Sequence, residues 1–206
     1  MDGATSLTCQ VAEIGALFDA LRGLGGQGEA LTSLLPSSRD LARRQAASRT
    51  SRRLPALRWL DDAIAAAPAV LRDALADWGR RAGDLEWRQT YARTEASEDF
   101  LDRYGWCELV GPGGICRDAH ISIGLLLLGP DCHYPPHSHP AVEHYVPLSG
   151  AAEWFDADRG WRDVAPLTPI LHRAEVVHAM RTSDRPLLAL FHWSGQGIGQ
   201  RARMRE

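Results

Sequence analysis

The residues best suited to chemistry lie close together in one short segment of the chain. In an extended strand alternate side chains lie on the same face, so His137 and His139 would point one way, and Glu143 and Tyr145 would also share a face. Imidazole and carboxylate ligands together suit a first-row divalent metal such as zinc, iron(II) or manganese. The spacing therefore predicts one metal site, which His178, at the start of a later predicted strand, would complete.

The other histidines offer weaker candidates. All eight histidines lie at or beyond position 120, so any chemistry belongs to the C-terminal half of the chain. His144 would face away from Glu143 and is expected to be structural, whereas His172 competes with His178 as the ligand from the later strand. The cysteines are scattered without a C-x-x-C pair, so we expect buried or incidental thiols and no disulfide framework. They are Cys9, Cys107, Cys116 and Cys132.

The N-terminal part of the chain has a helical pattern. Apolar residues recur at spacings of three and four, which predicts a helical stripe formed by Leu7, Val11, Ile14, Phe18 and Leu21. The sequence from Ser37 to Asp40 has the form of a capping box, which marks the start of a helix. Pro55 and Pro68 stand where further helices could begin.

From about residue 100 the pattern changes to short β-rich runs separated by Gly, Pro and Asp. These runs cover residues 120–128, 143–148, 151–155, 161–164, 178–182 and 187–193. Many short strands with no helical period between them predict a sandwich or barrel. We therefore expect a helical segment over residues 1–95 that packs on or over a β-barrel over residues 100–195. Residues 196–206, rich in Gly and Arg, would form a frayed tail.

Composition excludes several classes of function. With 45% hydrophobic and 24% charged residues, the 206-residue chain has ordinary globular proportions. A net charge of −3 gives no electrostatic footprint for nucleic acid or an acidic membrane surface. The chain has no lysine, which excludes a Schiff-base or P-loop lysine. The apolar run 121–128 is too short to span a bilayer, and no signal peptide is evident, so a cytoplasmic protein is expected.

The histidine segment resembles a known motif. His137-x-His139-x3-Glu143-x6-Gly150 is similar to the first motif of the cupin superfamily, whose mainly β fold is a double-stranded β-helix, a jelly-roll barrel with a metal inside. His178 resembles the histidine of the second cupin motif, although Arg173 and Glu175 replace its usual proline and glycine.

Within the cupins, the stretch from Tyr134 to Tyr145 resembles the bacterial dimethylsulfoniopropionate (DMSP) lyases. Those enzymes also have a helical N-terminal segment of about a hundred residues, a tyrosine just before the first histidine, another two residues after the glutamate, and a tryptophan in the last strand. Tyr134, Tyr145 and Trp193 occupy these positions here.

The resemblance implies a metal-dependent β-elimination that cleaves DMSP to dimethyl sulfide and acrylate. The ligands would be His139, Glu143 and His178, with His137 either a fourth ligand or a substrate contact. The metal would bind the substrate carboxylate, and a divalent cation nearby lowers the pKa of a phenol, so Tyr145 is implied as the base that removes the α proton.

Two further aromatic residues would contact the substrate. Tyr134 is the reserve base or a donor that orients the carboxylate. Trp193 would offer its ring face to the sulfonium cation. The partner is thus a zwitterionic small molecule, with no nucleic acid or membrane, and the sequence is compatible with a homodimer. The alternatives are a metal cupin dioxygenase or isomerase acting on another small acid, and a non-catalytic cupin that senses a ligand.

Overall fold

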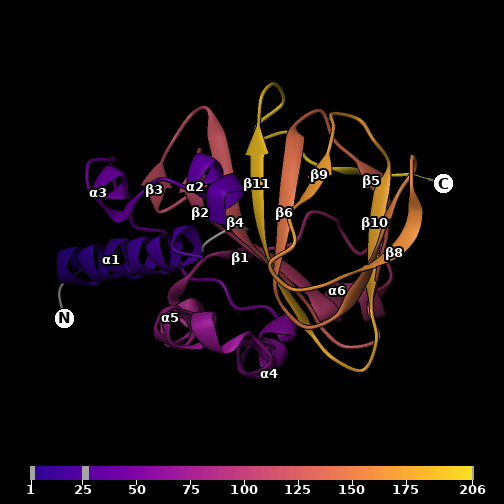
Figure 1. Cartoon of the computed structure of the whole chain (residues 1–206), viewed down its shortest axis with the longest axis horizontal. Coiled ribbons are helices and arrows are strands. Elements are labelled where there is room, and N and C mark those ends of the chain that lie inside the picture. The colour runs from indigo at the N-terminus through magenta and orange to yellow at the C-terminus, as the bar shows by residue number, and fades with distance from the viewer. Residues whose placement is uncertain (1–2, 25–27, 206) are drawn as a thin grey trace.

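The computed structural model describes residues 3–24 and 28–205, with helices gathered on one side and strands forming a barrel on the other (Figure 1). The helical side contains α1 (Gly3–Arg22), α2 (Gly28–Leu34), α3 (Ser38–Leu41), the 3-10 helix η1 (Pro55–Trp59), α4 (Leu60–Ala65), α5 (Ala69–Gly79) and the 3-10 turn η2 (Ala82–Asp84). A further helix, α6 (Glu98–Arg103), leads into the barrel. None of the described helices is long and apolar enough to cross a membrane.

The helix starts follow the signals in the sequence. At α3 the Ser37 side chain accepts a hydrogen bond from Asp40 N, and the Asp40 carboxylate accepts one from Ser37 N, so the predicted capping box is confirmed. Pro55 is the first residue of η1, and Pro68 is the N-cap of α5. These caps satisfy or remove backbone donors that a helix start would leave without partners.

The strands form two sheets that face each other, as the jelly-roll prediction requires, and all strand pairs among the described residues are antiparallel except β2 with β3. They are β1 (Trp87–Arg88), β2 (Tyr104–Gly111), β3 (Cys116–Arg117), β4 (Ile121–Leu128), β5 (His133–Ser138), β6 (Val142–Ser149), β7 (Ala152–Asp156), β8 (Gly160–Val164), β9 (Ile170–His172), β10 (His178–Thr182), β11 (Leu187–Ser194) and β12 (Arg203–Met204). Among the described residues, the larger sheet has the order β1-β2-β4-β11-β6-β9, with β3 beside β2. The smaller sheet has the order β12-β5-β10-β7-β8.

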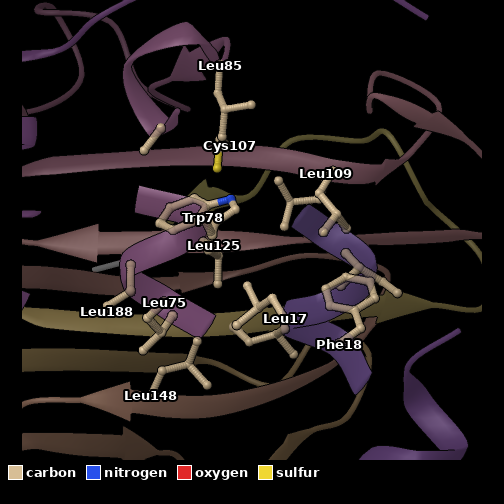
Figure 2. Packing of buried hydrophobic residues seen from close by; sticks show 14 of the residues in the cluster. Leu17, Phe18, Leu75, Trp78, Leu85, Cys107, Leu109, Leu125, Leu148 and Leu188 are labelled. Carbon is tan, nitrogen blue, oxygen red and sulfur yellow. The ribbon is translucent and has the colours of Figure 1, made fainter. Parts of the chain in front are cut away.

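The helices cover the outer face of the larger sheet. Leu17 and Phe18 of α1 and Trp78 of α5 pack against strand residues such as Leu125 and Leu188 (Figure 2). Burying a leucine or phenylalanine side chain contributes about 1.5–3 kcal/mol to the stability of the fold. The helices therefore stabilise the face of the sheet that would otherwise be exposed to solvent. The other face of the sheet is left for the interior of the barrel.

Three of the four cysteines belong to the hydrophobic cores, and none forms a disulfide, as predicted. All four are free, and Cys107, Cys116 and Cys132 are buried. Burial raises the pKa of Cys107 to about 12, which keeps the thiol protonated and unreactive.

Strand register lines up the inward-facing residues of the larger sheet in rows. In one row Glu108 pairs with Gly124, Gly124 with Phe191, and Phe191 with Tyr145. Gly124 is required there, because a Cβ would lie 2.0 Å from the carbonyl oxygen of Cys107 and 2.5 Å from the Phe191 ring. In the next row Ser122 pairs with Trp193, Trp193 with Glu143, and Glu143 with His172. The sheet thus brings residues from distant parts of the sequence to one end of the barrel.

The C-terminal residues differ from the expected frayed tail. Strand β12 pairs with β5, with Arg203 opposite Ser138 and Met204 opposite His137. Arg205 N donates to Pro136 O at 2.8 Å, and the Arg205 guanidinium bonds the Ser138 hydroxyl at 2.9 Å. The prediction of fraying is wrong because composition alone does not show that an open edge of β5 is available for pairing.

Candidate metal centre

Three predicted ligands meet inside the barrel. His139 follows the end of β5, Glu143 lies on β6 and His178 begins β10, and their ligand atoms all lie within 4.8 Å of one another. Glu143 Oε2 is 2.9 Å from His139 Nε2 and 3.2 Å from His178 Nε2. All three side chains are 1–2% exposed. Two imidazoles and a carboxylate at this spacing are a donor set for a divalent transition metal.

Backbone carbonyls orient both imidazoles. His139 Nδ1 donates to Ala141 O at 3.0 Å, and His178 Nδ1 donates to Val176 O at 2.9 Å. A carbonyl only accepts, so Nδ1 holds the proton and Nε2 is directed at the cluster, the arrangement that metal-ligating histidines usually have. Within the described part of the chain, the buried His178 Nε2 makes no hydrogen bond, because its proton is on Nδ1 and the Glu143 Oε2 atom 3.2 Å away can only accept. The residues therefore fit a bound metal.

Charges in the cluster are strongly coupled. Burial raises the pKa of Glu143, but the adjacent His139 and His178 lower it by more, and the result is well below the usual range. Burial lowers the pKa of His139, and the Glu143 carboxylate more than reverses this, so the net pKa lies above its ordinary value. Without a cation, the cluster therefore holds a proton between His139 and Glu143. A metal would take the place of this proton, so metal affinity must fall in acid.

His137 lies beside the three-residue cluster but outside it. Its Nδ1 contacts Pro135 O at 2.8 Å, its ring stacks on Tyr134 at 3.9 Å and 7°, and it meets the edge of His178 at 4.2 Å. Burial holds the pKa of His137 well below its usual value. The neutral ring lines the cavity next to the cluster, which suits either of the two roles predicted for it.

The structure distinguishes between His178 and His172, the two candidates for the ligand from a later strand. His178 belongs to the cluster, whereas His172 lies behind it, stacked on the His178 ring at 4.1 Å and 11°. Burial lowers the pKa of His172 to about 3. His144 points to the other side of β6 and pairs edge-on with His192 at 6.0 Å, so its expected orientation away from Glu143 is observed.

A cavity of about 310 Å³ opens beside the cluster. Tyr134, His137, His139, Glu143, Tyr145 and Trp193 all line it. Tyr145 is buried, and burial together with the Glu143 carboxylate raises its pKa well above the usual value. The phenol is therefore protonated in the absence of a cation. A divalent cation bound by Glu143 would offset the carboxylate charge and favour the phenolate.

Trp193 contacts the cluster in a way that the sequence does not reveal. Its Nε1 donates a hydrogen bond to Glu143 Oε1 at 2.6 Å, and its ring stacks on His139 at 4.1 Å. Since Oε2 faces the histidines, this bond orients the carboxylate for coordination. Trp193 was predicted only to offer its ring to a sulfonium, because a tryptophan in a strand gives no signal of where its N–H points.

Sequence reasoning also missed part of the cavity wall. Arg88 at the end of β1 and the following Gln89 and Thr90 line it, and Arg201 and Ala202 line it from the C-terminal segment. Neither segment carries a motif, and the second was expected to fray. Only the fold brings them to the barrel opening.

The fold and the ligand set define a cupin-type barrel with a buried two-histidine, one-carboxylate centre. A family model described as dimethylsulfoniopropionate lyase matches residues 32–189. The chain belongs to the dimethylsulfoniopropionate lyase family, as the motif resemblance indicated.

Similar proteins carry the same description. The chain is 34% identical over 134 residues, 65% of each chain, to the dimethylsulfoniopropionate lyase DddQ of Ruegeria pomeroyi. It is 34% identical over 119 residues to the putative dimethylsulfoniopropionate lyase DddL of Cereibacter sphaeroides, covering 56% of this chain and 48% of that one. The matches thus span 65% and 48% of the length of these relatives.

Solved structures show the same fold. A structure described with the DMSP lyases RdDddP and RnDddQII has a TM-score of 0.82 and 29% identity over the whole of both chains. The DddQ structure from Ruegeria pomeroyi has a TM-score of 0.71 and 26% identity, covering 90% of this chain and 96% of that one.

Proposed function

We propose that this protein is a metal-dependent carbon–sulfur lyase that cleaves DMSP by β-elimination to dimethyl sulfide and acrylate. The observation that carries the proposal is that His139, Glu143 and His178 form one ligand cluster, and that Tyr145 lines the same cavity as His139 and Glu143. Family membership supports the substrate, because similar chains are described as DMSP lyases.

Removal of the α proton requires catalysis, because the α proton of a carboxylate is very weakly acidic. A divalent cation held by His139, Glu143 and His178 would supply the positive charge that binds the substrate carboxylate and favours the Tyr145 phenolate. Affinity at such a site follows metal availability, so zinc, iron(II) and manganese all remain candidates.

Tyr145 then acts as the general base in our proposal. Its phenolate oxygen takes the proton from the α carbon, and the electron pair of that C–H bond forms the new double bond between the α and β carbons. The bond from the β carbon to sulfur breaks, and its electrons stay on sulfur, which leaves as neutral dimethyl sulfide. Acrylate keeps the carboxylate, and protonated Tyr145 passes its proton to solvent before the next turnover.

The other cavity residues bind and enclose the substrate. Burial holds the pKa of Tyr134 well above its usual value, so this phenol is a donor, suited to a hydrogen bond to the substrate carboxylate. His137 contacts the substrate from the same side in our proposal. The aromatic rings of Trp193 and Phe191 exclude water and provide faces for the sulfonium. A cytoplasmic location and a homodimer stay predictions from the sequence.

The direct test is gas chromatography of the headspace above purified, metal-loaded protein supplied with DMSP. We expect dimethyl sulfide and acrylate in equal amounts, without oxygen uptake. Protein that contains metal but releases no dimethyl sulfide would refute the proposal. Oxygen consumption with another small acid would instead favour the dioxygenase alternative.

A further inference from the structure

A chain of hydroxyl groups runs along one wall of the cavity and joins Thr90 to Tyr134. Thr90 Oγ1 lies 2.7 Å from the hydroxyl of Tyr104, whose oxygen lies 3.5 Å from that of Tyr134. The Tyr91 hydroxyl contacts the Tyr134 hydroxyl at 3.3 Å. At the other end, Trp106 Nε1 donates to Thr90 Oγ1 at 3.1 Å. Thr90 therefore stands between an indole donor and the phenols of the site.

The indole fixes the role of the Thr90 oxygen. A tryptophan N–H can only donate, so Thr90 Oγ1 accepts that bond and its own hydrogen is free for the Tyr104 oxygen 2.7 Å away. The neighbouring Gln89 holds this segment in place, because its side-chain amide donates to the backbone carbonyls of Leu101 and Tyr104. Thr90 is thus a fixed anchor for the Tyr104 phenol.

Tyr134 connects the Tyr104 phenol to the proposed substrate site. Its side chain is 3% exposed, and buried hydroxyls are nearly always hydrogen-bonded, so its hydroxyl position depends on the two phenols that contact it, Tyr104 and Tyr91. Its ring packs on Tyr104 at 4.9 Å between centroids and lies flat on His137 at 3.9 Å. A shift of the Tyr104 phenol would therefore move both the hydroxyl of Tyr134 and the ring that rests on His137.

We propose that Thr90 is a positioning residue for the substrate: through Tyr104 it sets the hydroxyl of Tyr134, which binds the substrate carboxylate. This rests on the proposed function, because the contact between Tyr134 and substrate belongs to that function. Thr90 itself lines the cavity but lies outside the three-residue metal cluster. The assignment therefore predicts an effect on substrate binding without an effect on metal content.

The test compares Thr90→Val, which keeps the shape of the side chain but removes the hydroxyl, with Thr90→Ser, which keeps the hydroxyl. Loss of one hydrogen bond between neutral groups corresponds to about a 3- to 10-fold change. We expect Thr90→Val to raise KM by this factor with kcat changed less than KM, and Thr90→Ser to restore the wild-type KM. Equal KM values for wild type and Thr90→Val would overturn the proposal, as would a serine variant as impaired as the valine variant.

A double-mutant cycle tests whether Thr90 acts through Tyr104. Tyr104→Phe removes the hydroxyl that joins Thr90 to Tyr134 and keeps the ring, which stacks on Phe100 at 4.7 Å. Groups that act in series give non-additive effects, so Thr90→Val combined with Tyr104→Phe should raise KM no more than the worse single variant. Effects that multiply would show independent action and overturn the relay.

A matched threonine controls for general structural damage. The Thr182 hydroxyl is buried, donates to Gly129 O at 2.7 Å and accepts from Cys132 N at 2.9 Å, and its residue does not line the cavity. Thr182→Val should lower the melting temperature and leave KM unchanged, and a KM rise equal to that of Thr90→Val would overturn the proposal. If Thr90→Val does not fold, Tyr104→Phe alone must reproduce the KM rise, and a wild-type KM there would equally overturn it.

Assays on the wild-type protein distinguish failure of the proposed function from failure of the inference about Thr90. If metal-loaded wild type releases no dimethyl sulfide, the proposed function fails. Calorimetric titration with acrylate, which has the same carboxylate, then still tests Thr90, because Thr90→Val should weaken binding and Thr90→Ser should not. If wild type is active but these variants match it in KM, only the inference about Thr90 fails.

Discussion

Replacing Trp193 by phenylalanine separates the two contacts that this side chain makes with the metal centre. The Trp193→Phe variant loses the 2.6 Å hydrogen bond from Nε1 to Glu143 Oε1. It keeps an aromatic ring in place to stack on His139, where the tryptophan ring lies 4.1 Å away. Any loss of metal affinity in the variant therefore reports on the orientation of the Glu143 carboxylate.

The size of the effect follows from the charge of the acceptor. A hydrogen bond to a charged group contributes about 1.5–3 kcal/mol, and every 1.4 kcal/mol is a tenfold change in a binding constant. Loss of a bond that orients a metal ligand typically lowers affinity about 10- to 100-fold, which agrees with this range. We therefore expect the dissociation constant for metal to rise about 10- to 100-fold in the variant.

The assay is competition for zinc between the protein and a chromophoric chelator at fixed pH and ionic strength. Trp161→Phe is the matched control, because Trp161 is on β8, is 38% exposed and does not line the cavity. The control should bind metal as the wild type does. Metal affinity within twofold of wild type in Trp193→Phe would refute the view that Trp193 orients the ligand.

Three further predictions concern the site and the fold. Tyr145→Phe should keep its metal and melting temperature but release dimethyl sulfide at least about 100-fold more slowly, as expected for loss of a general base; activity within severalfold of wild type would assign the base elsewhere. Glu143→Ala should lose metal, measured by inductively coupled plasma mass spectrometry, whereas His144→Ala, on the opposite face of β6, should keep it; full occupancy in Glu143→Ala would contradict the ligand assignment. Burial lowers the pKa of His192 to about 4 from an ordinary value near 6.5, so between these pH values the unfolded state binds more protons than the folded state. The contribution of His192 to the free energy of unfolding is therefore fully present above pH 6.5 and is lost as the pH falls to about 4. The melting temperature of His192→Gln should fall less over that interval, and identical slopes would exclude this contribution.

Local signals in the sequence predict about half of the strands and the metal ligands. The expected strand runs at 120–128, 178–182 and 187–193 are confirmed to within one residue at each end. The alternation of faces places Glu143 toward the cluster and His144 away from it. Such features depend on residues a few positions apart, which the period of a strand determines.

Features that depend on long-range packing are not visible in the sequence. Strand β2 (Tyr104–Gly111) was not predicted, because its buried pattern lacks regular alternation. Thr90 reaches the cavity only because β1 pairs with β2, and the C-terminal segment becomes ordered only because β12 pairs with β5. The hydrogen bond from Trp193 to Glu143 depends on the register of β11 against β6. No motif in the sequence records these pairings.

The central claim is that one divalent cation is held by His139, Glu143 and His178 beside Tyr145. Anomalous diffraction from crystals of zinc-loaded protein, recorded on both sides of the zinc absorption edge, tests it most directly. The account predicts one strong peak, about 2.0–2.2 Å from His139 Nε2, His178 Nε2 and a Glu143 carboxylate oxygen. A peak elsewhere, or none in protein that retains zinc in solution, would contradict it.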